Sequence, residues 1–173
     1  MVSPGVASLL QVLAAAVGAS AAVEVGTGAG ISAASMLAGM APEGVVTSID
    51  SEAEHQVIAR ETLAAAGLAA SRFRLINGQA AEVLGRLTDG AYDIVLLATK
   101  PADIARHIEQ AHSLLRPGGL LIINRALAGD RVADPSARDA QTVAMRQAVA
   151  AMHDDERFIT SLLPAGEIGR AHV

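Results

Sequence analysis

The sequence lacks cysteine and tryptophan, and its aromatic residues are only one tyrosine and two phenylalanines. Without cysteine the chain forms no disulfide, offers no thiol nucleophile and binds no metal through sulfur thiolates. So few aromatic side chains provide no evident stacking surface for a flat ring, and the substrate stays unidentified. Acidic side chains outnumber basic ones by 18 to 13, which gives a net charge of −5. Because binding to a phosphate backbone requires a concentrated positive face, we expect no nucleic-acid partner.

Hydrophobic residues make up 51% of the 173 positions, which excludes a disordered chain and suits one domain with a core. We predict a single domain over residues 1–173. The uncharged segment 1–23 has the composition of a signal peptide or membrane span, but it lacks a basic N-terminal region. Leu9, Leu13 and Val17 recur there as on one face of a helix. We therefore expect a core helix, no membrane segment and a cytoplasmic protein.

Short apolar runs alternate with helical patterns, which is typical of βα units over a parallel sheet. Strands are predicted over 22–26, 45–49, 73–77, 93–97 and 120–124. Helices are predicted over 32–39, 52–66, 79–87, 102–115 and near 138–152. Two last strands, 158–163 and 168–172, flank a Pro-Ala-Gly turn and could pair as a hairpin. The predicted fold is α/β and doubly wound (Rossmann-like), with a mainly parallel seven-stranded sheet and a C-terminal antiparallel hairpin.

The most informative segment follows the first predicted strand and reads Glu24-Val25-Gly26-Thr27-Gly28-Ala29-Gly30-Ile31-Ser32. Glycines at a strand-to-helix turn let a ligand approach bare backbone, and the helix N-terminus faces its anionic end. The dinucleotide fingerprint would place its third glycine at position 31, which is Ile31. Glu24 would repel a crowded pyrophosphate and attract positive charge. A zwitterionic sulfonium nucleotide therefore fits this loop better than NAD.

Polar residues also follow the next two predicted strands. Asp50 ends the second strand, where an ionised carboxylate can accept hydrogen bonds from both hydroxyls of a ribose. Gln79 follows the third strand, where its amide could meet an adenine edge. Each has a structural alternative, because Asp50 could belong to the start of a helix and Gln79 could be an ordinary first-turn residue. Their occurrence at the ends of successive strands favours a shared ligand.

Taken in order, these segments resemble the class I S-adenosylmethionine-dependent methyltransferases, and within them the bacterial O-methyltransferases similar to catechol and caffeoyl-CoA methyltransferases. The resemblance covers almost the whole chain and is carried by 23–30, 47–50, 77–80, 82–84, 92–95, 114–119 and 162–164. It implies S-adenosylmethionine as cofactor, a small-molecule methyl acceptor and a homodimer. The glycines would lie against the methionine part, Glu24 near its amino group, Asp50 on the ribose and 78–80 on the adenine. The expected cofactor-binding residues are Glu24, Gly26, Thr27, Gly28, Gly30, Ser32, Asp50, Ser51, Gly78, Gln79, Ala80 and Ala98.

The same resemblance implies a divalent metal, which the family usually holds with an aspartate after the fourth strand and an Asp-Asn pair after the fifth. Here Ala98 stands at the first of these positions, Asn124 at the second and Arg125 at the third. An arginine adds positive charge and supplies no acceptor atom for a metal. We therefore predict no bound magnesium.

Two cations follow the fourth and fifth strands. Lys100, the only lysine, could act as a general base if it is buried beside the sulfonium, and it could equally be a solvated loop lysine. Arg125 could bind an anionic oxygen of the substrate or pair with a neighbour such as Asp130. Family members usually carry further N-terminal helices over the substrate, so we expect either a truncated chain or a more open acceptor site.

We predict an S-adenosylmethionine-dependent methyltransferase that works by in-line O-methylation of a small-molecule hydroxyl, mainly through positioning and without a divalent metal. One alternative is a degenerate methyltransferase-fold protein that serves as a cofactor-binding or interaction module, which Ala98, Asn124 and Arg125 suggest. The other is a nicotinamide-dependent oxidoreductase, which the glycine loop and Asp50 suggest and which Ile31 opposes.

Overall fold

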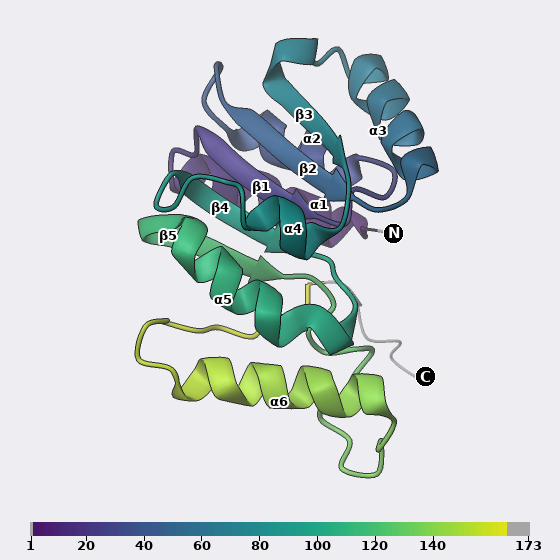
Figure 1. Cartoon of the computed structure of the whole chain (residues 1–173), viewed down its shortest axis with the longest axis vertical. Helices are drawn as coiled ribbons and strands as arrows, with labels where there is room; N and C mark the ends of the chain where they lie inside the picture. The colour runs from purple at the N-terminus through teal and green to yellow at the C-terminus, as the bar shows by residue number, and fades with distance from the viewer. Residues whose placement is uncertain (1, 166–173) are drawn as a thin grey trace, which may run out of the picture.

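The structure, a computed structural model, describes residues 2–165. Five parallel strands form one sheet in the order β3-β2-β1-β4-β5 (Figure 1). The strands are β1 (Ala21–Val25), β2 (Val45–Asp50), β3 (Phe73–Asn77), β4 (Tyr92–Leu97) and β5 (Leu115–Ile123). The strand order reverses between β1 and β4, so the sheet is doubly wound as predicted.

Helices cover both faces of this sheet (Figure 1). One layer contains α1 (Pro4–Ala16), α2 (Ile31–Gly39) and α3 (Ala53–Ala65). The other contains α4 (Ala80–Leu84), α5 (Ile104–Leu114) and α6 (Ala140–Asp154). Two short 3-10 turns, η1 (Ala70–Arg72) and η2 (Pro101–Asp103), precede β3 and α5.

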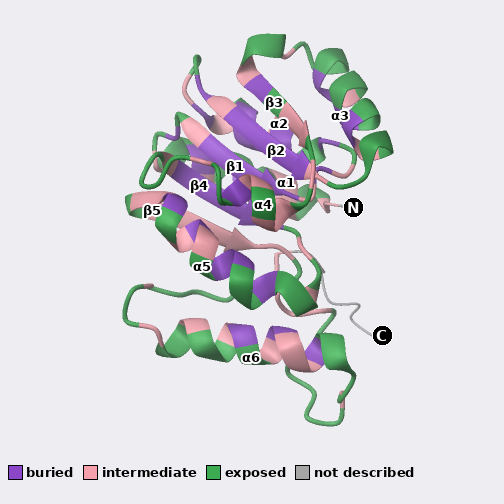
Figure 2. Ribbon diagram, viewed as in Figure 1, coloured by how far each residue is buried: buried purple, intermediate pink, exposed green. Residues whose placement is uncertain are grey.

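The core lies on both sides of the central strands, whose buried residues form the middle of the molecule (Figure 2). Along β4, Ile94 and Leu96 pack toward the layer of α1, α2 and α3, while Val95 and Leu97 pack toward α5 and α6. Successive side chains of a strand point to opposite faces, so a strand covered on both faces must be apolar throughout. This double burial explains why the strands could be located as continuous apolar runs.

The predicted N-terminal core helix is confirmed, although a different stripe of α1 is buried. Leu10 and Ala14 are buried against α2, whereas Leu9, Leu13 and Val17 are only half-buried. The contact with α2 is so close that a Cβ on Gly39 would lie 2.0 Å from the carbonyl oxygen of Gln11. Within residues 2–165, no helix has the length and apolarity to cross a membrane.

Two boundaries in the second half of the sheet differ from the prediction. The strand expected over 120–124 begins earlier, because β5 starts at Leu115, which already pairs with Tyr92, and a register shift follows before Ile94. Gly118 accommodates that irregularity with a φ of +76°, which a side chain would disfavour. The helix expected over 79–87 is shorter, since α4 ends at Leu84.

The predicted strand at 158–163 is wrong. Residues 155–165 contain no strand, and Ile159, Leu162 and Leu163 are exposed. A β-forming composition becomes a strand only beside a backbone that completes its hydrogen bonds. Here the Phe158 N–H donates to the Asp155 carbonyl and closes a turn. The predicted strand 168–172 lies outside the described residues. The described sheet therefore has five strands, whereas seven were expected.

Candidate functional site

A cavity of about 170 Å³ opens at the carboxyl ends of β1, β4 and β5, where the strand order reverses. Its lining residues are Val2, Gly26, Thr27, Gly28, Ala29, Ile31, Ser32, Ala98, Asn124 and Arg125. Doubly wound sheets bind ligands at this edge. Whole-ligand pockets usually measure about 300–1,000 Å³, so this cavity suits one part of a nucleotide-sized ligand. Five of the predicted cofactor-binding residues are brought together in its lining: Gly26, Thr27, Gly28, Ser32 and Ala98.

The glycine loop between β1 and α2 has a left-handed backbone, with φ of +92° at Gly26, +50° at Gly28 and +80° at Gly30. A Cβ on Gly26 would lie 2.6 Å from the Ala98 carbonyl oxygen, so this glycine is required by the protein itself. At Gly28 a Cβ would meet no protein atom within 4 Å, so bare backbone faces open space there. Gly28 is therefore the position where a ligand can approach the chain. Gly30 lies at the start of α2 and packs on Ala59 instead of lining the cavity.

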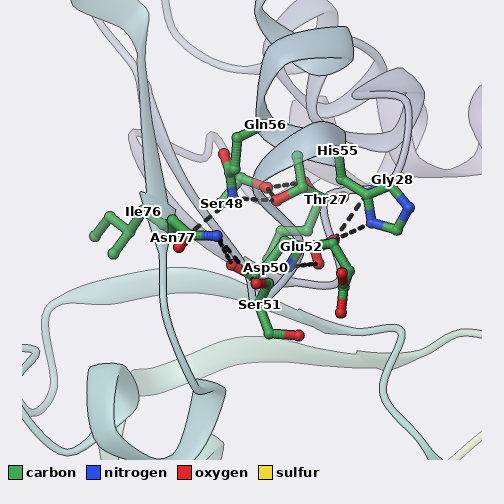
Figure 3. Close-up of polar contacts among 11 residues, drawn as sticks. Thr27, Gly28, Ser48, Asp50, Ser51, Glu52, His55, Gln56, Ile76 and Asn77 are labelled. Atoms are coloured by element: carbon green, nitrogen blue, oxygen red, sulfur yellow. Dashed lines mark hydrogen bonds and ion pairs between the residues drawn. The ribbon is translucent and has the colours of Figure 1, made fainter.

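A chain of buried hydrogen bonds lies behind the glycine loop. Glu24 on β1 is fully buried, and its two carboxylate oxygens accept hydrogen bonds from the hydroxyls of Ser32 and Ser48, the latter at 2.6 Å. Ser48 Oγ lies 2.7 Å from Thr27 Oγ1, which in turn accepts a hydrogen bond from Gln56 Nε2 at 3.1 Å (Figure 3). An ionised carboxylate only accepts, so Ser32 and Ser48 both donate to an ionised Glu24. Thr27 then donates to Ser48 and accepts from Gln56.

Burial is the main influence on Glu24 and raises its pKa from 4.5 to about 7, against the hydrogen bonds from Ser32 and Ser48 that stabilise the charge. Glu24 is not a lining residue of the cavity, so the structure does not support the direct contact with a ligand that was expected for it. Ser32 links the two, since it is a lining residue of the cavity and its hydroxyl donates a hydrogen bond to Glu24. A hydroxyl that donates one hydrogen bond keeps lone pairs that can accept others.

Asp50, at the end of β2, joins the glycine loop to the start of α3. Its Oδ2 accepts the Gly28 N–H at 3.2 Å and lies 3.0 Å from His55 Nδ1, while its Oδ1 accepts the Glu52 N–H at 3.0 Å (Figure 3). Partial burial favours the neutral acid, but these hydrogen bonds outweigh it and hold the pKa of Asp50 below its usual value. Asp50 therefore has the role near the start of α3 that was its structural alternative, and its carboxylate keeps one free lone pair, on Oδ1, that could accept from a ribose hydroxyl.

The residues predicted at an adenine lie along the same edge beyond Asp50. Gly78 N–H donates to the Asp50 carbonyl at 2.9 Å. Gln79 is exposed and directly precedes α4 as its N-cap residue, without a capping side-chain hydrogen bond. Ala80 follows in the first turn, and the exposed Ser51 offers its carbonyl to Asn77 Nδ2 at 3.1 Å. Ser51, Gly78, Gln79 and Ala80 stand outside the cavity lining, next to the end of β2.

The ends of β4 and β5 do not form the metal site that the resemblance would imply. Ala98 and Asn124 are fixed by backbone hydrogen bonds to Val25 and Leu97, at 2.8 and 2.9 Å. Ala98 has no ligand atom, Arg125 is cationic, and no group of three His, Cys, Asp or Glu side chains within residues 2–165 could hold a metal ion. These residues do not fit a divalent cation, which requires a set of oxygen ligands.

The two cations after these strands have different positions. Lys100 is exposed, precedes η2 and is not a lining residue of the cavity. It therefore lacks the buried location that the role of general base would require. Arg125 lines the cavity. The expected pairing of Arg125 with Asp130 is wrong for the described part of the chain, where no such ion pair occurs.

Sequence reasoning missed the inner partners of this site. His55 contacts Asp50, and Ser48 and Gln56 support Thr27, but none of the three was predicted to belong to the site. One signal was available: Ser48, like Thr47, is a polar residue inside a buried strand, and it pairs directly with Glu24 in the register of β1 and β2.

Fold and site together define a nucleotide-binding protein of the doubly wound α/β class, with a glycine loop and an ionised carboxylate at adjacent strand ends. The model of the family described as O-methyltransferase matches residues 1–169. The chain therefore belongs to the O-methyltransferase family, which confirms the family predicted from the sequence and favours it over the nicotinamide-dependent alternative.

Individual relatives agree with this membership. A Mycobacterium tuberculosis H37Rv protein named as a probable O-methyltransferase is 45% identical over 166 residues, covering 96% of this chain and 74% of the relative. A Corynebacterium glutamicum crystal structure is 31% identical with a TM-score of 0.89, covering 96% of this chain and 78% of that one. The O-methyltransferase TomG from Streptomyces achromogenes, involved in tomaymycin synthesis and solved with S-adenosylmethionine, is 27% identical with a TM-score of 0.80, covering 88% and 69%.

Proposed function

We propose that this protein binds S-adenosylmethionine along the carboxyl edge of its sheet and methylates an oxygen of a small molecule without a divalent metal. The observation that carries the proposal is that Gly28 links the cavity to the carboxylate of Asp50. The cavity exposes the backbone of Gly28, and the N–H of the same residue is bonded to Asp50 at 3.2 Å. One glycine thus faces the space for the methionine part and fixes the carboxylate suited to a ribose.

The chain offers a partner for each part of that cofactor. The loop 26–32 would hold the methionine part, and Ser32 Oγ can accept a hydrogen bond from its amino group. Asp50 would accept from a ribose hydroxyl, and Gly78, Gln79 and Ala80 would meet the adenine, because β3 lies beside β2 at the same edge.

When bound, S-adenosylmethionine supplies a methyl group on a positively charged sulfur; the acceptor oxygen forms the new C–O bond while the electron pair of the C–S bond returns to sulfur. The protein's own contribution is to hold the reacting atoms in line and exclude water, which can supply several kcal/mol of the barrier. No carboxylate, imidazole or lysine is among the described lining residues. We do not assign a general base, and the exposed position of Lys100 argues against that role.

Independence from magnesium is part of the proposal and is supported by Ala98 and Arg125, which replace metal ligands with a methyl group and a guanidinium. A cytoplasmic homodimer completes it. The exposed side of the uncharged helix α1 includes Pro4, Val12, Ala15 and Ala16, and this apolar surface gives a physical reason for association. Sedimentation across a concentration series tests the dimer, and fractionation of expressing cells tests the compartment.

Isothermal titration with S-adenosylhomocysteine, with and without magnesium, tests the cofactor and the metal together. We expect binding in the micromolar range, about −8 kcal/mol, that magnesium does not change. Tighter binding with magnesium would contradict metal independence, and no binding at millimolar ligand would overturn the proposal. Asp50→Asn should weaken binding, whereas Asp130→Asn, on an exposed loop, serves as the matched control.

Turnover is tested separately by counting S-adenosylhomocysteine formed from S-adenosylmethionine with a panel of hydroxylated and acidic acceptors. Product that depends on both substrates supports the enzyme. Intact cofactor binding with no product across the panel would favour the alternative of a cofactor-binding or interaction module, which the replaced metal ligands Ala98 and Arg125 suggest.

A further inference from the structure

The cavity at the carboxyl edge has one charged side chain in its described lining, the guanidinium of Arg125. The other polar side chains there are those of Thr27, Ser32 and Asn124, none of which carries charge. A guanidinium has five N–H donors and no acceptor, so its natural partner is an anion, which it can bind through two parallel hydrogen bonds.

Arg125 is held at this place by the backbone. Asn124 N–H donates to the Leu97 carbonyl at 2.9 Å, which fixes the end of β5 against β4. The next residue, Arg125, turns into a left-handed conformation with φ of +63°. Ala128 and Asp130 in the same loop share this conformation, so the tight turns of the loop set the course of its backbone at Arg125.

The loop that follows Arg125 is secured by other arginines. Arg146 on α6 donates to the carbonyl oxygens of Val132 and Asp134, at 2.8 and 2.7 Å, and Arg131 pairs with Asp139 at 2.5 Å. Arg125 makes no hydrogen bond or ion pair through its side chain with any residue of the described range 2–165. Arg125 is exposed and lines the cavity, so its guanidinium is available to a ligand while its neighbours hold the loop.

Two anions could meet this guanidinium: the carboxylate of the cofactor and an ionised oxygen of the methyl acceptor. The strand order separates them. The loop that would hold the methionine part follows β1, whereas Arg125 follows β5, and β4 lies between. With neighbouring strands about 4.8 Å apart, β1 and β5 are about 10 Å apart at this edge. Arg125 therefore reaches the shared cavity from the strand end that lies farther from the glycine loop, which favours the methyl acceptor as its partner.

We propose that the methyl acceptor is a small organic anion whose ionised oxygen, a carboxylate or an acidic phenolate or enolate, is bound by Arg125 and is the nucleophile. This inference rests on the proposed function. The oxygen lone pair forms the bond to the methyl carbon, the C–S bond breaks, and its electron pair neutralises the sulfonium. No proton is released in this step, which agrees with a cavity lining that holds no base among its described residues.

Binding to the protein saturated with S-adenosylhomocysteine tests the charge requirement, with salicylate and the neutral salicylamide, benzoate and benzamide as matched probes. We expect the anions to bind about 10- to 100-fold more tightly than the amides, as a charged hydrogen bond allows. Arg125→Gln should remove this preference, and Arg125→Lys should restore part of it. Arg138→Gln is the control, because Arg138 is an exposed arginine of the same loop outside the cavity lining. No preference for either anion in the wild type would overturn the inference.

The two sources of the anion are distinguished with S-adenosylhomocysteine and 5′-methylthioadenosine, which lacks the amino-acid carboxylate. If Arg125 serves the acceptor, Arg125→Gln leaves the affinity for both nucleosides unchanged. Weaker binding of S-adenosylhomocysteine alone would assign Arg125 to the cofactor and overturn the inference. Failure of the wild type to bind S-adenosylhomocysteine would instead defeat the proposed function.

A kinetic readout follows once an acceptor is turned over. For acidic phenols of graded pKa, kcat/KM should rise with pH as each acceptor ionises and then reach a plateau. Arg125→Gln should raise KM for the anion by about tenfold or more. A pH profile that is the same for all acceptors would indicate a protein base and contradict the proposal.

Discussion

The fully buried carboxyl of Glu24 should make the stability of this protein fall as the pH rises. Its pKa is about 7 in the folded protein and 4.5 when exposed. Below pH 4.5 the group is protonated in both states, and above 7 its charge must be buried on folding. The difference is worth about 3 kcal/mol of the free energy of unfolding, present at low pH and lost as pH rises through 7.

Glu24→Gln isolates this contribution, because an amide fills the same space, remains uncharged and can still bond to Ser32 and Ser48. We expect the wild-type advantage over the variant to decrease by about 3 kcal/mol between pH 4.5 and 8. His107 acts in the opposite direction, since burial lowers its pKa below 6.5 and stability is gained as pH rises toward that value. Both proteins contain His107, so its effect cancels in the difference.

Urea unfolding followed by circular dichroism at pH 5, 6, 7 and 8 gives the free energy of unfolding of each protein. Glu54→Gln, on the exposed side of α3, is the control and should have the wild-type pH dependence. Parallel curves for the wild type and Glu24→Gln would refute the buried, titrating carboxylate.

The remaining predictions concern the loop and the sheet. Asp50→Ala should weaken S-adenosylhomocysteine binding by about 1.5–3 kcal/mol in calorimetry, and an unchanged affinity would remove Asp50 from the site. Gly28→Ala should fold with a modestly lower melting temperature, because a φ of +50° disfavours a side chain, and should bind S-adenosylhomocysteine poorly, because its methyl group would occupy open ligand space. Gly26→Ala should lower the melting temperature, since its Cβ would lie 2.6 Å from a carbonyl oxygen; equal stability of the two variants would contradict this distinction. Asp93→Ala should cost about 2–3 kcal/mol in urea unfolding, because Arg116 Nε, which donates to Asp93 at 2.6 Å, loses its partner. Loss of stability no greater than that of an exposed control such as Asp130→Ala would show that this pair contributes little.

The central strands and the glycine loop were predictable because each is specified locally. A strand covered on both faces must be a continuous apolar run, and the backbone at Gly26 and Gly28 needs residues without a side chain. The polar network behind the loop was not predictable in the same way. Ser48 meets Glu24 only because β1 and β2 pair in one particular register, and Gln56 reaches Thr27 from α3. Such contacts depend on tertiary packing rather than on spacing along the chain.

The errors have equally local causes. On α1, apolar residues occur around most of the helix, so periodicity did not decide whether Leu9 or Leu10 faces the core. In the stretch 158–163 the composition suits a strand, but no neighbouring strand completes its hydrogen bonds within the described sheet. Lys100 is exposed and Arg125 lines the cavity because of the course of two loops, which the residue types alone do not determine.

The linear order of strand ends has an evolutionary consequence. Groups proposed for adenine, ribose and methionine follow β3, β2 and β1, while the residue proposed for the acceptor follows β5. Substitutions after β5 can therefore change the choice of acceptor without disturbing the residues proposed to bind the methyl donor. Position 125 would be the first place to alter when redirecting this scaffold toward new acceptors.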